Sequence, residues 1–226
     1  MYFCTLFIED VCTLLVTIME NIKVGWKMEK QVIITIGREF GSGGHEIADK
    51  LAQRLHIKLY DRNLLEEMAA SSGYNMKEME KYDEKPVNHF FSRSVNGYSN
   101  SLEKNLAESQ FNYLKGIASR GKSFVVVGRC AETVLKDQPA MISIFILGDI
   151  TVKQQRVEAI YNLSPHEALT KMKRHDKKRK AYHNYYAEGK WGDSRSYDLT
   201  INSSKLGIDQ TVEVLLRYIE DRMQCM

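Results

Sequence analysis

Apolar residues are arranged along this chain in two alternating patterns. Continuous apolar runs, typical of strands in a parallel sheet that is covered on both faces, occupy residues 32–36, 124–127, 142–147 and 199–201. Apolar residues also recur at helical spacing over 47–55, 63–70, 102–117 and 208–219. Strands that alternate with helices predict an α/β domain in three layers, with a parallel central sheet and helices on both of its faces.

The first apolar run leads into a glycine-rich segment that precedes a helix. Gly41, Ser42, Gly43 and Gly44 follow one another, and His45 comes next. Glycines let successive backbone N–H groups converge on one anion, and the N-terminus of the following helix adds partial positive charge. The segment therefore predicts a phosphate-binding loop. A glycine-rich turn without a ligand is the alternative.

This loop lacks the lysine that is typical of phosphate-binding P-loops. Gly44 and His45 stand where lysine and a small or hydroxyl residue are expected. Arg38, at the start of the loop, is the candidate for the missing cation, and Ser42 offers the one nearby hydroxyl for Mg²⁺. A protonated His45 would add a phosphate contact that depends on pH, since histidine ordinarily titrates at about pH 6.5.

A long basic helix is predicted in the C-terminal half of the chain. Ser164, Pro165 and Glu167 form an N-cap, a first-turn proline and a capping-box glutamate, so the helix should begin there and end near Gly189. Residues 171–190 contain eight Lys or Arg against two acidic residues. This excess fits a polyphosphate ligand, with a solvated helix face as the alternative. Because the excess is confined to one helix, binding of nucleic acid is disfavoured.

The remaining composition indicates a cytoplasmic protein without a membrane segment. A net charge of +3 is too small to indicate a nucleic-acid or membrane partner by itself. The four cysteines show neither metal-ligand spacing nor a disulfide framework, which favours a reducing compartment. The first 19 residues are apolar, but they lack the basic start of a signal peptide and are interrupted by Glu9 and Asp10.

Residues 1–27 are interpreted as an N-terminal extension that arises from a misplaced start codon, with Met19 or Met28 as the true start. An accessory helix is the competing interpretation. Residues 28–226 form the predicted domain.

Five segments together carry a family resemblance. In chain order they are IGREFGSGGHEIADKLAQRL, LYDRNLL, VVVGRCAETVL, KMKRHDKKRKAYHNYY and YDLTINSS. This ordered set resembles the cytidylate-kinase-like family of P-loop kinases, which is related to the bacterial cytidylate kinases. The resemblance extends from about residue 31 to the C-terminus. It implies a three-layer P-loop NTPase fold with a helical lid at about 164–190, an acceptor-side insert at about 71–101, and the use of ATP and Mg²⁺.

The resemblance also implies roles for individual residues. Asp61, after a short strand predicted at 57–60, and Arg129, after the run at 124–127, would bind the acceptor. The catalytic cations would be Arg38, Arg174 and Arg179, and the lid would further contain Asp176, Lys178 and Tyr182. Asp61 is equally well explained as a helix N-cap, and both roles can hold. For Arg129 a surface salt bridge is the alternative, and the phosphate-binding role is favoured. The aspartate that the family has after the arginine is Cys130 here, which leaves the associated base or sugar contacts open.

These observations predict ATP-dependent phosphoryl transfer to a nucleoside monophosphate, with CMP or dCMP as the acceptor that the resemblance implies. Asn202, Ser203 and Ser204 follow the last apolar run, where they either border the adenine of ATP or form a turn and N-cap cluster. Two alternatives remain open. One is a non-catalytic module that binds nucleotide, and the other is a kinase whose small-molecule acceptor is not a nucleotide. Neither nucleic acid nor a membrane is an expected partner.

Overall fold

The computed structural model describes residues 30–61, 63–72, 83, 94–95, 98–99 and 101–226. Within the described chain, the compact unit runs from Gln31 to Met226. The interpretation of 1–27 as an extension, the choice of start codon and most of the expected insert at 71–101 lie outside the described residues.

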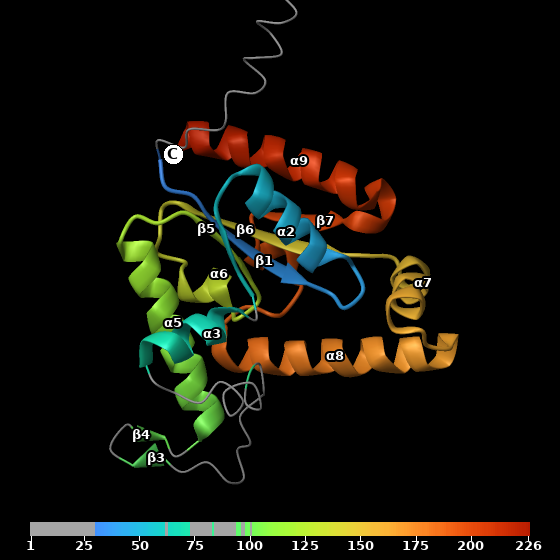
Figure 1. Ribbon diagram of the computed structural model, residues 1–226, viewed down its shortest axis with the longest axis horizontal. Coiled ribbons are helices and arrows are strands. Elements are labelled where there is room, and N and C mark those ends of the chain that lie inside the picture. Colours follow the sequence, from blue (N-terminus) through green and yellow to red (C-terminus); the bar gives the residue numbers. More distant parts are fainter. Residues whose placement is uncertain (1–29, 62, 73–82, 84–93, 96–97, 100) are drawn as a thin grey trace, which may run out of the picture. The chain divides into compact units, whose positions relative to one another are not determined.

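Five parallel strands form the central sheet (Figure 1). They are β1 (Ile33–Arg38), β2 (Lys58–Tyr60), β5 (Phe124–Val127), β6 (Met141–Leu147) and β7 (Leu199–Asn202). Their spatial order is β2-β5-β1-β6-β7, and a separate antiparallel pair joins β3 (Ser94–Val95) to β4 (Tyr98–Ser99). The four apolar runs and the short strand after residue 57 are thus confirmed as strands, with small shifts at their ends.

Strand β1 lies in the middle of the sheet. Ile33 is in register with Phe124 of β5 on one side and with Met141 of β6 on the other. The residues from Ile33 to Ile36 are all buried, which explains why this strand is a continuous apolar run rather than an alternating one. The loop that follows β1 therefore begins from the most rigid part of the sheet.

Helices cover both faces of the sheet. They are α2 (Gly44–Arg54), α3 (Asn63–Ser72), α5 (Leu102–Ser119), α6 (Ala131–Val134), α7 (Ile150–Tyr161), α8 (Pro165–Tyr186) and α9 (Ser203–Cys225), with a short 3-10 turn at Ser194–Ser196. Figure 1 shows α2 and α9 on one face and α3, α5 and α6 on the other, while α8 runs along the edge where the strands end. In the part of the chain that the structure describes, no helix is long and apolar enough to cross a membrane.

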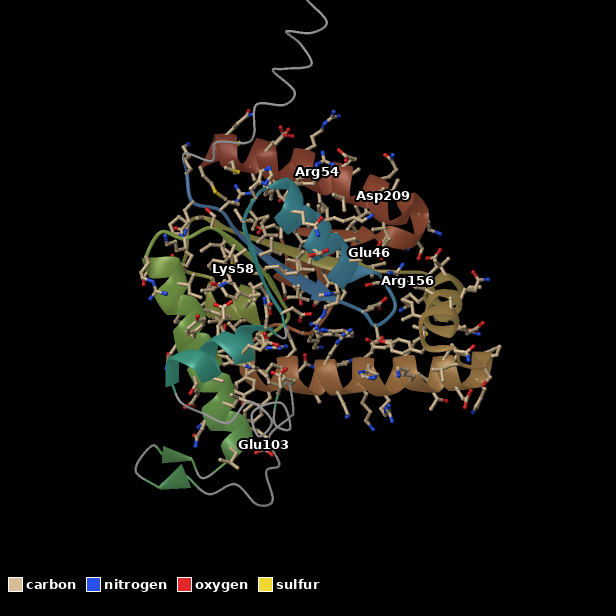
Figure 2. The ribbon with its side chains drawn as sticks, in the orientation of Figure 1. Glu46, Arg54, Lys58, Glu103, Arg156 and Asp209 are labelled. Carbon is tan, nitrogen blue, oxygen red and sulfur yellow. The ribbon has the colours of Figure 1, made fainter. Side chains whose placement is uncertain are left out.

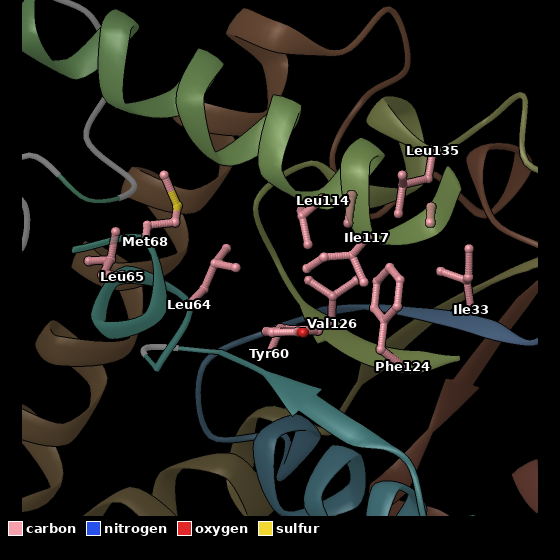
Figure 3. Packing of buried hydrophobic residues seen from close by; sticks show 12 residues of the cluster. Ile33, Tyr60, Leu64, Leu65, Met68, Leu114, Ile117, Phe124, Val126 and Leu135 are labelled. Carbon is pink, nitrogen blue, oxygen red and sulfur yellow. The ribbon is translucent and has the colours of Figure 1, made fainter. Parts of the chain in front are cut away.

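One buried hydrophobic cluster packs between β5 and the helices α3 and α5 (Figure 3). Phe124 and Val126 of β5, Leu64 of α3 and Leu114 of α5 all belong to it. On the opposite face, the apolar stripes of α2 and α9 are buried, as Leu51 and Leu215 illustrate. The three-layer α/β prediction is confirmed.

Helix α8 begins as its sequence predicts. The Ser164 side chain accepts a hydrogen bond from the backbone N–H of Glu167, and the Glu167 carboxylate accepts one from the backbone N–H of Ser164. Pro165 occupies the first turn, where its missing N–H costs nothing. The helix ends at Tyr186, slightly before Gly189. Helices α6 and α7 were not predicted from the sequence.

A carboxylate attaches the edge strand β7 to a buried serine of β6. Asp198 accepts hydrogen bonds from the backbone N–H of Ser143 at 2.7 Å and from its hydroxyl at 2.9 Å, and the Asp198 N–H donates back to that hydroxyl at 2.9 Å. Directly after β7, at Ser203, the chain contacts the glycine-rich loop: the Ser203 hydroxyl donates to the Ser42 carbonyl at 2.7 Å. The Asp198 contact therefore also positions one wall of the loop.

Replacing Asp198 should destabilise the protein. Asp198→Ala leaves the N–H of buried Ser143 without its acceptor, so we expect the free energy of unfolding to fall by about 1–3 kcal/mol. Asp198→Asn keeps an oxygen acceptor and should lose less. Urea unfolding of the two variants measures both effects. A loss below about 0.5 kcal/mol for Asp198→Ala would show that this contact does not hold β7 in place.

Candidate functional site

The glycine-rich loop connects the end of β1 to the start of α2. Gly43 is the N-cap of α2 in a left-handed conformation, with φ of 77°, and makes no side-chain capping bond. A Cβ atom at this position would lie 2.2 Å from Cδ1 of Ile208, so a larger residue does not fit. Within the part of the chain that the structure describes, no side chain of the N-cap residue covers this helix terminus, as an anion-binding terminus requires.

The absence of a lysine at position 44 has a steric cause. A Cβ atom on Gly44 would lie 2.6 Å from Cβ of Arg38. Cβ atoms in real structures essentially never come this close to another heavy atom. The Arg38 side chain therefore occupies the space that a side chain at position 44 would need. Ser42 is also enclosed: it is 3% exposed, and its hydroxyl donates to the Glu39 carbonyl at 2.9 Å.

His45 and Asp61 are brought together from two elements. Nδ1 of His45, in the first turn of α2, lies 2.9 Å from Oδ2 of Asp61, which follows β2. This hydrogen bond raises the pKa of His45 above its ordinary value, against the opposing effect of burial. Burial also acts to raise the pKa of Asp61, but the hydrogen bond from His45 and the charges of Arg38 and Arg129 outweigh it and lower that pKa.

Arg129 lies in a strained turn at the end of β5. Arg129 and Cys130 both adopt left-handed backbone conformations, with φ of 59° and 51°. Non-glycine residues in this region store strain, which is common at functional sites. Arg129 is 2% exposed, and its Nη2 donates to Asp83 at 2.8 Å and to the Asp61 carbonyl at 3.4 Å. The buried ion pair with Asp83 holds the guanidinium at the carboxyl edge of the sheet.

Three arginines from different elements line one small cavity. Arg38 comes from β1, Arg129 from the turn after β5 and Arg179 from α8. The cavity measures about 20 Å³, enough for one water molecule. Its wall also contains Glu132 and His183, whose Oε1 and Nε2 atoms lie 2.8 Å apart and are both buried. Such a convergence of guanidinium groups suits an anion with several oxygens.

Helix α8 is docked directly on the loop. The Asp176 carboxylate accepts a hydrogen bond from the Phe40 N–H at 2.7 Å, and Nη1 of Arg179 donates to the Arg38 carbonyl at 3.3 Å. The Phe40 ring stacks on His175, with ring centroids 4.3 Å apart. Burial raises the pKa of Asp176, although the hydrogen bond from Phe40 opposes that rise. Helix α8 therefore packs against the loop and lines the arginine cavity, and its role as a lid stays a prediction.

The structure brings together most of the residues that the sequence singled out. The loop residues 41–45 join Arg38, Asp61, Arg129, Asp176 and Arg179 at one edge of the sheet. Tyr182 is buried and lines the arginine cavity. Arg174 and Lys178 are different, because both lie on the exposed face of α8, away from this group. Asn202 caps α9 through its side chain, and Ser203 contacts the loop, so the turn-and-cap explanation of 202–204 is confirmed.

Sequence reasoning missed several charged residues of the site. Glu39 belongs to the loop itself, and its carboxylate lies 2.6 Å from Nζ of Lys153 on α7. The Glu132–His183 pair and Asp83 were not identified either. The signal for Glu39 and Lys153 was weak, because α7 has no clear apolar stripe and neither residue belongs to a recognisable motif. His183 lies one residue beyond Tyr182, within the helix that was identified.

Comparison with known proteins agrees with this geometry. The model of the cytidylate kinase-like family matches residues 33–205. The cytidylate kinase of Pyrococcus horikoshii is 27% identical over 177 residues, which cover 77% of this chain and 81% of that protein. A crystal structure of an uncharacterized protein from Eubacterium ventriosum is 41% identical and has a TM-score of 0.67, over 84% of this chain and 99% of that one.

A further likeness concerns the fold alone. Shikimate kinase from Bacteroides thetaiotaomicron shares 13% identity, with a TM-score of 0.50 over 84% of this chain and 98% of its own. The parallel sheet, its helical layers and the loop after β1 thus form a P-loop kinase fold. Because the family model spans most of the chain, including the loop, the arginine turn and α8, the protein belongs to the cytidylate kinase-like family.

Proposed function

We propose that this protein transfers the γ-phosphoryl group of ATP to a nucleoside monophosphate, with CMP or dCMP as the acceptor. One observation carries the proposal: a cavity lined by three arginines lies directly beside a glycine-rich loop that ends in an uncapped helix. A kinase that acts on a monophosphate must hold two anionic groups side by side. The family relationship supports a phosphotransferase, and the cytidylate kinase of Pyrococcus horikoshii supports this choice of acceptor.

The donor side would be the loop and the start of α2. The N–H groups at residues 43–45 and the N-terminus of α2 would bind the phosphates of ATP. Mg²⁺ retains several waters and is held largely by substrate phosphates in sites of this kind, so we expect it to enter with ATP. Ser42 stays a predicted ligand, although its hydroxyl now bonds to a backbone carbonyl.

The acceptor side would be the arginine cavity. The planar guanidinium of Arg129 can bind two phosphate oxygens at once, while Asp83 fixes its orientation. Arg38 lies between the loop and this cavity, where it can contact both phosphates. Asp61 lies near Arg38, whose charge helps to lower the pKa of the Asp61 carboxyl. The cavity is too small for a nucleotide as it stands, so α8 must move outward before the acceptor enters.

Transfer would be direct and in line. A phosphate oxygen of the acceptor forms the new bond to the γ-phosphorus, the bond to the leaving ADP oxygen breaks, and charge spreads over the γ-phosphate oxygens. Arg38 and Arg179 would stabilise that charge, while α8 excludes water. Arg174 and Lys178 contribute only if α8 turns its exposed face inward, and their catalytic and lid roles stay predictions.

A second acceptor class is favoured by the cavity wall. Cys130 replaces the aspartate of cytidylate kinases, and the buried Glu132–His183 pair presents polar atoms beside the arginines. These differences fit a phosphorylated small molecule other than a nucleotide. The same assay distinguishes the two acceptor classes.

Release of ADP from Mg-ATP by the full chain should depend on the acceptor. We expect CMP or dCMP to accelerate it well above the rates with UMP, AMP or GMP. Arg129→Ala should lower kcat/KM by roughly 10²-fold or more, because the acceptor phosphate loses a bidentate, charge-assisted partner. Arg217→Ala removes an exposed arginine of α9 and is the matched control, with no expected effect.

The outcomes of this assay separate the alternatives. ATP binding without turnover on any monophosphate would contradict the nucleotide kinase. Turnover on phosphorylated sugars or acids alone would favour the second acceptor class. If Arg129→Ala and Arg217→Ala behave alike, the arginine cavity is not the acceptor site.

ADP binding should weaken as pH rises through the pKa of His45. The hydrogen bond to Asp61 raises that pKa, so the imidazolium persists above the ordinary value and is lost only at higher pH. We expect ADP affinity in the wild type to fall as the pH rises above the ordinary pKa of histidine, and to vary less in His45→Gln. Asp61→Asn removes the carboxylate and should move the midpoint to lower pH. Calorimetric titrations at several pH values test this, and parallel profiles for all three proteins would contradict it.

A further inference from the structure

Lys153 of α7 is a buried cation that the proposed mechanism does not yet use. It is 5% exposed, and its Nζ lies 2.6 Å from Oε2 of Glu39 in the glycine-rich loop. The same carboxylate oxygen accepts a hydrogen bond from the Gly148 N–H at 3.2 Å. Burial of a lysine is costly unless it is paired. The Glu39 carboxylate thus stabilises the buried ammonium group of Lys153 beside the loop.

The stem of Lys153 runs between the loop and the end of β6. A Cβ atom on Gly41 would lie 3.0 Å from the Lys153 carbonyl oxygen and 3.2 Å from its Cβ. On the other side, a Cβ atom on Gly148 would lie 3.1 Å from Cγ of Lys153. The side chain is therefore enclosed by two glycines, and its ammonium group reaches the loop in a defined position.

A cation from α7 can approach the loop because Gly44 stands where an ordinary P-loop has its lysine. Position 44 is closed to any side chain by Arg38, and Arg38 lines the arginine cavity with Arg129 and Arg179. Arg156, one turn after Lys153, is engaged differently: it forms an ion pair with Glu46 of α2 (Figure 2) and is 30% exposed. Lys153 is thus the buried cation that touches the loop on its donor side.

We propose that Lys153 takes the role of the missing loop lysine and binds the β- and γ-phosphates of the nucleotide, with Glu39 as its partner before the nucleotide arrives. This inference rests on the proposed function. An ammonium group has three donors and acts as a point charge on phosphate, so it needs no bidentate geometry. In the described residues one of these donors is matched with Glu39. Arg38 then contacts the acceptor phosphate. Lys153 and Arg38 together supply the positive charge that a single lysine supplies in an ordinary P-loop.

The test compares ADP with AMP, which differ by the β-phosphate. Dissociation constants are measured by calorimetry with Mg²⁺ on the full chain. Lys153→Met should weaken ADP binding about 10- to 100-fold and change AMP binding less than about 3-fold. Lys153→Arg should restore part of the loss. Lys50→Met, which removes an exposed, ion-paired lysine of α2, is the matched control and should leave both constants unchanged.

Measuring Lys153→Met in the Glu39→Gln protein distinguishes phosphate binding by Lys153 from a structural role of its ion pair with Glu39. Glu39→Gln removes the ion pair, so a purely structural role of Lys153 would leave no further effect of Lys153→Met in that background. We expect the full loss of ADP affinity to persist there. If Lys153→Met leaves the ADP constant unchanged in the Glu39→Gln protein, the inference is wrong while the proposed function stands. If the wild type binds ADP no more tightly than AMP, both are wrong.

Discussion

The close approach of Arg38 to Gly44 is the constraint on which the rest of the site depends. With 2.6 Å between the Arg38 Cβ and the place of a Cβ on Gly44, position 44 cannot carry a lysine while the loop keeps this backbone path. Arg38 is the last residue of β1, the central strand of the sheet, whose preceding residues are all buried, so its position is not easily adjusted. Position 44 therefore carries no cation, and in the proposed function the positive charge for the donor phosphates comes from Lys153, outside the loop.

Helix α8 then joins the two halves of the site. Asp176 and Arg179 bond to the backbone on either side of Glu39, while Tyr182 and His183 reach the arginine cavity one turn later. A movement of this one helix would therefore open the donor loop and the acceptor cavity together. The Asp176 carboxylate at the loop and the buried Glu132–His183 contact hold α8 in the present arrangement. Closure of this kind excludes water from phosphoryl transfer.

The fold was largely predictable because its strands are continuous apolar runs and its longest helix carries a complete capping box. Arg129 and Asp61 were also predictable, since each follows a strand end. Lys153 and Glu39 were not, because their pairing joins residues far apart in the sequence and depends on how α7 packs. The exposed positions of Arg174 and Lys178 on α8 could not be predicted from the sequence either. Basic residues on one helix look alike in the sequence, and only packing separates Arg179, which faces the loop, from Arg174, which does not.

In the proposed function, the glycine-rich loop and the arginine cavity are two halves of one active site. The most direct measurement is the affinity of a bisubstrate compound in which adenosine and cytidine are joined through their 5′ oxygens by five phosphates. If both halves bind at once, the linked compound should bind at least about 10²-fold more tightly than ADP or CMP alone. An affinity equal to that of ADP would contradict the account, because the cavity would then take no part in binding an acceptor.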